Sequence, residues 1–170
     1  MNRPIWMLTV FLSMLSAIQL KAQKNEVNPN GYNKLYYGNG QLSSEGRMVD
    51  GKPEGYWKTY YINGQLKSEG NRVNHQLDST WVFYAKTGDT TKKINYHYGV
   101  KNGYTYTYTS TTNPKYPNPV VGKIMYVQGQ RQGLSYFYRP DGSLKRTAHY
   151  RNGKKHGYEK LFNKRGRVVE

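Results

Sequence analysis

Two consecutive stretches decide the fold. Residues 31–54 (GYNKLYYGNGQLSSEGRMVDGKPE) and 55–78 (GYWKTYYINGQLKSEGNRVNHQLD) agree at 13 of 24 positions. The pattern starts again at Ser79, Gly103, Gly133 and Gly157, with spacings of 24 residues and one of 30. A fixed period of this length indicates a repeat architecture. We therefore predict six units, of which the fourth carries an insertion and the sixth ends at Glu170.

Each unit holds two turn signals. In most units a glycine stands nine residues after the unit start, as in Asn39-Gly40 and Asn63-Gly64. A second glycine stands twenty residues after the unit start, as in Asp50-Gly51. Asn-Gly and Asp-Gly supply the positive φ angles that tight hairpin turns need. The turns leave two segments of about seven residues, a common strand length. Each unit is therefore predicted to form a β-hairpin.

An aromatic column recurs at the fifth position after each unit start. Its members are Tyr36, Tyr60, Tyr84, Tyr108, Tyr138 and Phe162. Residues of one parity share one face of a strand, so stacked hairpins would align these rings as a structural ladder. Trp57 and Trp81 have the opposite parity and either pack as well or form an exposed binding stripe. We predict an all-β fold, an elongated single-layer antiparallel sheet of tandem hairpins.

The segment GYWKTYYINGQLKSEG at residues 55–70 resembles the bacterial variant of the MORN repeat. The resemblance extends over residues 31–170 and includes proteins described as YwqK-type antitoxins. It implies an elongated antiparallel sheet made of successive hairpins, and it implies no catalytic residues. The antitoxin description implies neutralisation of a toxin through protein–protein contact.

The N-terminus predicts export. Arg3 precedes an uncharged, mostly apolar stretch at residues 5–18, and Ala22 suits the position before a signal-peptidase cut. A membrane anchor is the alternative, but a span needs about 20 apolar residues. We expect a signal peptide at 1–22, a linker at 23–30 and the repeat domain at 31–170. The expected location is the periplasm, the outer surface or the medium.

Composition narrows the function. The chain has no cysteine, which excludes disulfides and thiolate metal sites, and 18 tyrosines with 36% hydrophobic residues argue against a Leu-rich helical bundle. The four histidines do not show metal-ligand spacing. Glu45 and Glu69 share a repeat column and predict a ladder instead of a catalytic pair. We expect no catalytic residues, no cofactor and no metal.

Basic residues gather at the C-terminus of a chain with a formal net charge of +16. Residues 143–170 contain nine Lys or Arg and two Glu, which form either a solvated end cap or a surface for an anionic partner. The candidates for binding here are Lys145, Arg146, Arg151, Lys154 and Lys155. Expected export argues against nucleic acid and favours anionic lipid, envelope polymer or an acidic protein.

The insertion at residues 110–119 (STTNPKYPNP) contains three prolines, which exclude a regular strand. We expect a loop at a hairpin tip that exposes Tyr116, either as part of a binding face or as a neutral insertion. Together these features predict an exported, non-catalytic repeat protein that binds a protein or an anionic envelope component through its sheet. The alternatives are neutralisation of a toxin and, more remotely, hydrolysis of an envelope polymer.

Overall fold

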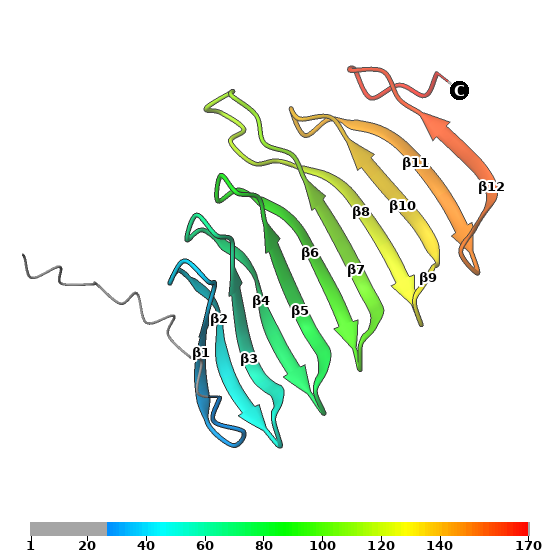
Figure 1. Ribbon diagram of the computed structural model, residues 1–170. Helices are drawn as coiled ribbons and strands as arrows, with labels where there is room; N and C mark the ends of the chain where they lie inside the picture. Colours follow the sequence, from blue (N-terminus) through cyan, green and yellow to red (C-terminus); the bar gives the residue numbers. More distant parts are fainter. Residues whose placement is uncertain (1–26, 170) are drawn as a thin grey trace, which may run out of the picture.

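A computed structural model describes residues 27–169, which form one open antiparallel sheet of 12 strands (Figure 1). The strands are β1 (Tyr32–Tyr36), β2 (Leu42–Val49), β3 (Lys52–Tyr60), β4 (Leu66–Val73), β5 (Gln76–Tyr84), β6 (Thr90–His97), β7 (Val100–Tyr108), β8 (Val120–Val127), β9 (Gln130–Arg131), β10 (Gly133–Tyr138), β11 (Leu144–Arg151) and β12 (Lys154–Leu161). No helix occurs among these residues. The predicted all-β fold is confirmed.

The strands follow one another across the sheet in chain order. The short β9 pairs only with β8, and β10 continues the path from β8 to β11. The aromatic column pairs with the residue that opens the second arm of each unit, from Tyr36 with Leu42 to an isolated bridge between Phe162 and Val168. The tandem hairpins are therefore built as the repeat predicts.

The glycine that opens each unit has a role that turn geometry does not explain. Gly55 has a φ of 68° and lies inside β3, where the pairing shifts from Gly46 with Trp57 to Arg47 with Glu54. This shift marks a β-bulge, which places an extra residue on one strand and increases the local twist. At the same position of the third unit, Ser79 adopts a φ of 58°. Turns therefore do not account for all the repeated glycines.

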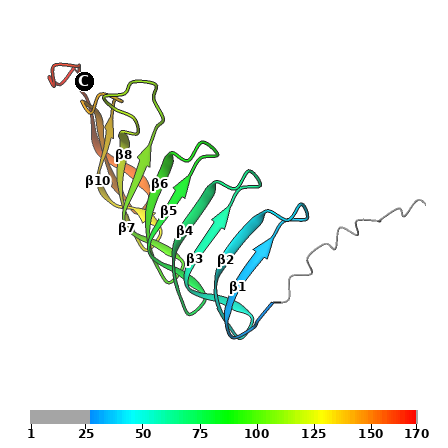
Figure 2. The same ribbon diagram turned by 90° about the vertical axis from the view of Figure 1, so that its left-hand side faces the viewer.

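The sheet is a single layer, and its strands are bent so that it curves (Figure 2). We call the side that carries Trp57 and Trp81 the Trp face, and the side that carries Tyr60 and Tyr84 the Tyr face. Alternation along the strands and the register place the two sets on opposite sides. The buried hydrophobic residues are Met48, Trp57, Trp81, Ile94, Ile124, Ala148 and Tyr150, which is a small core for the size of the sheet.

The insertion forms a loop between β7 and β8, as predicted. Residues 109–119 contain no strand, and the backbone N–H of Thr109 donates to the carbonyl of Pro119 across the base of the loop. The loop stands among the hairpin turns at one end of the strands (Figure 1). Tyr116 is half-buried, although we expected it to be exposed. The Nζ atom of Lys115 lies 5.4 Å from the centre of the Tyr116 ring.

The expected signal peptide and most of the linker lie outside the described residues. The described end of the linker is part of the first repeat unit, because the backbone N–H of Gly51 donates to the carbonyl of Pro29. In residues 27–169 there is no helix with the length and apolar character that a membrane crossing requires.

Candidate binding faces of the sheet

Trp57 and Trp81 form the floor of a groove on the Trp face. They are only 4% and 3% exposed, so an exposed tryptophan stripe is not what the structure has. The indole N–H of Trp57 donates to the carbonyl of Arg47 at 2.7 Å, and that of Trp81 to the carbonyl of Asn71 at 2.8 Å. Each indole ring is therefore buried by packing, and each indole N–H is hydrogen-bonded to the backbone.

Two glycines make room for these indoles. A Cβ atom on Gly46 would lie 2.6 Å from the Trp57 ring, and one on Gly70 would lie 2.4 Å from the Trp81 ring. In later units the large and small residues change places. Ile94 and Ile124 stand at the repeat position of the two glycines, and both pair with Thr105, which stands at the position of the tryptophans. Each arrangement combines a large and a small side chain across neighbouring strands.

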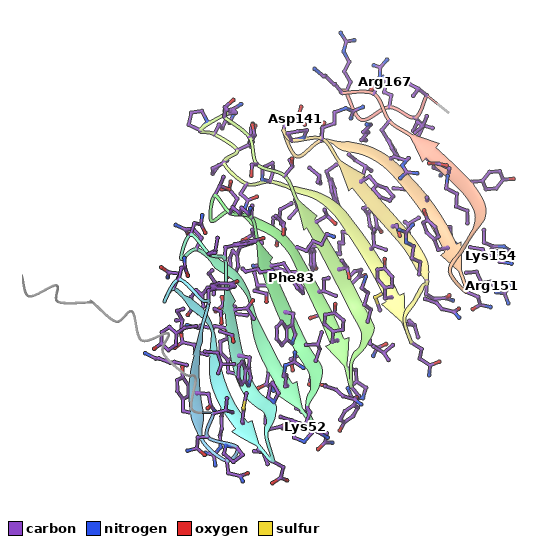
Figure 3. The ribbon with its side chains drawn as sticks, viewed as in Figure 1. Lys52, Phe83, Asp141, Arg151, Lys154 and Arg167 are labelled. Atoms are coloured by element: carbon purple, nitrogen blue, oxygen red, sulfur yellow. The ribbon has the colours of Figure 1, made fainter. Side chains whose placement is uncertain are left out.

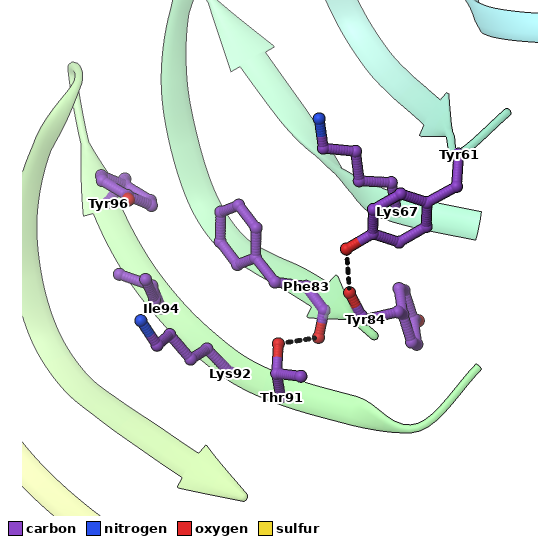
Figure 4. Close-up of a pocket in the computed structure, with 8 residues that line it drawn as sticks. All are labelled: Tyr61, Lys67, Phe83, Tyr84, Thr91, Lys92, Ile94 and Tyr96. Atoms are coloured by element: carbon purple, nitrogen blue, oxygen red, sulfur yellow. Dashed lines mark hydrogen bonds between the residues drawn. The ribbon is translucent and has the colours of Figure 1, made fainter. Parts of the chain in front are cut away.

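The groove itself has a volume of about 410 Å³ and runs over β1 to β5. Its lining residues are mostly apolar, and they are Leu35, Met48, Pro53, Trp57, Leu77, Trp81 and Phe83, with Ser44, Thr59, Ser68 and Arg72. A second cavity of about 370 Å³ shares Phe83, and Ile94 and Tyr96 lie beside that ring (Figure 4). An apolar groove thus continues onto β6.

Arg72 is the charged residue in the lining of the first cavity. Its guanidinium carbon lies 5.3 Å from the centre of the Trp81 ring, and its Nη1 donates to the carbonyl of His75 at 2.9 Å. Burial lowers the pKa of Arg72. Within the described part of the chain, the buried Nε has no hydrogen-bond partner. The groove therefore has one cation, Arg72, in its lining.

Beyond the groove, tyrosines and cations alternate on the Trp face. Register pairs Tyr96 with Lys101, Tyr126 with Arg131 and Tyr150 with Lys155. We call these six residues the Tyr–cation ladder. The Nζ atom of Lys101 lies 5.1 Å from the Tyr126 ring centre, and the guanidinium carbon of Arg131 lies 5.2 Å from that of Tyr150. The ladder gives the C-terminal half of this face a positive, aromatic surface.

The Tyr face carries the carboxylate ladder that the sequence predicted. Tyr60 donates its hydroxyl to Glu45 at 2.5 Å, and Tyr84 donates to Glu69 at 2.6 Å. The bond from Tyr60 lowers the pKa of Glu45, while burial and the neighbouring carboxylate raise the pKa values of Tyr60 and Tyr84. These residues link neighbouring hairpins, which agrees with the structural role expected for the aromatic column.

A further ladder along the turns escaped prediction. In each of five units, a side-chain oxygen accepts a hydrogen bond from the backbone N–H of the next turn, at 2.9 to 3.4 Å. The acceptors are Asn30, Glu54, Asp78, Asn102 and Gln132, and the donors are Asp50, Asn74, Tyr98, Gln128 and Asn152. The acceptor residue differs from unit to unit, but each acceptor side chain has a carboxylate or amide oxygen. A repeat position that holds Asn, Asp, Gln or Glu in all five of these units could have predicted this ladder from the sequence.

The basic residues proposed for binding are divided between the two faces. Arg146 and Lys155 lie on the Trp face, where both form salt bridges with Glu159. Lys145 follows the parity of the Tyr face. Arg151 and Lys154 pair with each other at the tip of the β11–β12 hairpin (Figure 3). The structure therefore does not gather the five into one patch.

The histidines show no metal-binding geometry. His97 lies 3.5 Å from Asp78, and the rings of His149 and His156 are 6.2 Å apart. Among residues 27–169, no group of three or more His, Cys, Asp or Glu side chains is placed to hold a metal ion.

Comparison with known families agrees with the hairpin architecture. A family model described as the MORN repeat variant matches residues 29–50, 53–74 and 131–152. A search of curated proteins found no match. The matched stretches begin two residues before the unit starts at 31, 55 and 133, so the family register agrees with the repeat. These three stretches are therefore repeats of the MORN variant type.

Proposed function

We propose that this protein is an exported, non-catalytic binding module whose Trp face takes an acidic, partly apolar segment of a protein partner. The observation that carries the proposal is the groove over β1 to β5, where the partly exposed side chains of Leu35, Leu77 and Phe83 pack around the two buried indoles. An apolar groove is one of the recurring surfaces that take a segment of a protein partner. MORN-repeat proteins are generally non-catalytic binding proteins, which supports the assignment.

The charges around the groove favour an acidic segment. Arg72 lies in the lining of the groove, and the Tyr–cation ladder continues the same face with Lys101, Arg131 and Lys155. An apolar stretch of the partner would pack on Leu35, Leu77 and Phe83, which are partly exposed above the two indoles, and its carboxylates would reach these cations. Rigid aromatic and arginine side chains are the usual centres of binding energy at interfaces.

Photo-crosslinking in the native cells tests this assignment. A photoreactive amino acid replaces Ser44, a half-buried residue of the groove, or Thr80, an exposed residue of the Tyr face. We expect a protein adduct from position 44 that is absent from position 80. Equal adducts from both positions, or none from position 44, would overturn the proposed groove.

The identified partner then allows quantitative tests. We expect Arg72→Gln to weaken binding, with the affinity falling as salt rises, while Lys86→Gln in an exposed turn leaves the affinity unchanged. If the partner is a toxic protein whose growth inhibition this chain relieves, neutralisation of a toxin becomes its biological role. N-terminal sequencing of the mature protein tests export, and a chain that retains residues 1–22 in the cytoplasm would contradict it.

A further inference from the structure

The two halves of the sheet differ sharply in charge. Residues 27–89 contain seven Lys or Arg and six Asp or Glu, whereas residues 90–169 contain sixteen Lys or Arg and only Asp141 and Glu159 as acids. The excess therefore begins at β6, well before the basic C-terminus. Asp141 lies in the turn between β10 and β11, and Glu159 lies on the Trp face.

The change of charge is concentrated in one row across the Tyr face. In the N-terminal half, register places Lys34, Glu45, Lys58 and Glu69 side by side on β1 to β4, so cations and carboxylates alternate. The repeat positions of Glu45 and Glu69 are occupied by lysine in the next two units. The compensating carboxylates are therefore absent from this row beyond β4.

In the C-terminal half the row consists of lysines and tyrosines. It runs through Lys93, Tyr106, Lys123, Tyr136, Thr147 and Lys160, each paired in register with the next. We call it the Lys–Tyr row. The Nζ atom of Lys123 lies 4.4 Å from the Tyr104 ring centre and 6.0 Å from that of Tyr136. Among the described salt bridges, none reaches Lys93, Lys123 or Lys160.

We infer that the Lys–Tyr row is a second binding site, which takes an acidic polysaccharide lying across the strands. Neighbouring strands are about 4.8 Å apart, so Lys93 and Lys123 stand roughly 10 Å apart with one ring between them. This strand spacing is close to the advance of one hexose in an extended chain. Uronate or sulfate groups on alternate sugars would then meet the two lysines.

The aromatic rings complete the match to a sugar chain. Tyrosine offers an apolar face to the C–H groups of a pyranose and a hydroxyl to its oxygens, while the ammonium groups select for negative charge. A nucleic acid strand has similar charge, but the proposed export of the chain, on which this inference rests, favours a polysaccharide. The site is on the opposite face from the protein-binding groove, so the two ligands would bind independently.

The test measures binding of the full mature chain to polygalacturonate, to neutral dextran and to single-stranded oligothymidylate. The variant Lys93→Gln/Lys123→Gln removes two cations of the Lys–Tyr row. The matched control, Lys34→Gln/Lys58→Gln, removes two cations of the same row in the compensated half. Thermal melting of both variants verifies that they fold.

We expect tight, salt-sensitive binding of polygalacturonate and no binding of dextran. The Lys93/Lys123 variant should lose roughly tenfold in affinity, and the control less than about twofold, because exposed ion pairs contribute modestly and only the first pair faces the ligand. Equal losses in both variants, binding of dextran, or tighter binding of the oligothymidylate would overturn the inference. If the chain does not bind polygalacturonate but still forms the protein adduct at position 44, this inference is wrong and the proposed function is retained.

Discussion

Substitution of Gly70 by alanine tests the packing of the Trp face most directly. A Cβ atom at this position would lie 2.4 Å from Cδ2 of Trp81, compared with the ordinary contact range of 3.4–4 Å. The backbone of Gly70 does not have a positive φ, so the strain is purely steric. Trp81 is 3% exposed, and an indole displaced towards the groove would lose its packing and its bond to the Asn71 carbonyl.

The expected cost follows from three effects. Forcing an extra methyl into a packed site costs about 1–3 kcal/mol, and loss of the indole hydrogen bond adds about 1 kcal/mol. Restriction of the unfolded chain by alanine offsets about 0.4–1 kcal/mol. We therefore expect Gly70→Ala to lower the free energy of unfolding by about 2–3 kcal/mol.

Urea denaturation followed by circular dichroism measures this loss, and two variants control it. Gly122→Ala places a methyl on another strand glycine, 3.5 Å from Thr107, and should change stability by less than about 1 kcal/mol. In a Trp81→Thr background, which copies Thr105 of the fourth unit, Gly70→Ala should become neutral or stabilising. A loss of the same size with and without the indole would refute the steric argument.

Three further substitutions test other parts of the fold. Ser79→Gly should raise thermal stability by about 0.5–1 kcal/mol, because Ser79 holds a φ of 58° that costs a non-glycine residue about 1–2 kcal/mol. Glu54→Ala should cost about 1–2 kcal/mol in denaturant titration, because its two carboxylate oxygens accept the N–H groups of Asn74 and His75. Glu54→Gln should keep only about half of that stability, because its amide retains one acceptor oxygen and turns an N–H donor towards the second N–H group. The hydroxyl of Tyr60 lowers the pKa of Glu45 below the ordinary value of a glutamate, so this carboxylate stabilises the fold above that ordinary pKa and stops doing so as the pH falls through the lowered pKa. Glu45→Gln should therefore flatten the acid limb of a stability–pH profile, and an unchanged limb would contradict the argument.

Sequence reasoning predicted the hairpins well because their determinants are local. The turn residues and the alternation of Tyr36, Tyr60 and Tyr84 each act within one unit, and the 24-residue period then fixes which residues become neighbours. The same reasoning assigned Trp57 and Trp81 to the face opposite Tyr60. It could not assign their burial, because in a single-layer sheet alternation separates two faces without showing which one packs.

The features that were missed depend on contacts between units. The burial of Trp81 requires Gly70 on the preceding strand, and the turn ladder joins residues 20 positions apart or more. A bulge and a turn can both need a residue with positive φ, so a glycine in the sequence does not by itself show which of the two is formed. Only the register of the assembled sheet separates these alternatives.

Each repeat unit joins its neighbours at the turns and forms the two surfaces of the sheet with the side chains in the middle of its strands. The turn ladder joins neighbouring hairpins through bonds from main-chain N–H groups to side-chain oxygens, from Asn30 to Gln132. Side chains in the middle of the strands are then free to change, and they do: Trp gives way to Thr105 and Ser135 on one face, and Glu gives way to Lys93 and Lys123 on the other. Stacking does not use a carboxylate at this strand position after β4, so lysine can stand there as Lys93 and Lys123. The positive row that results is the surface proposed above for an acidic polysaccharide.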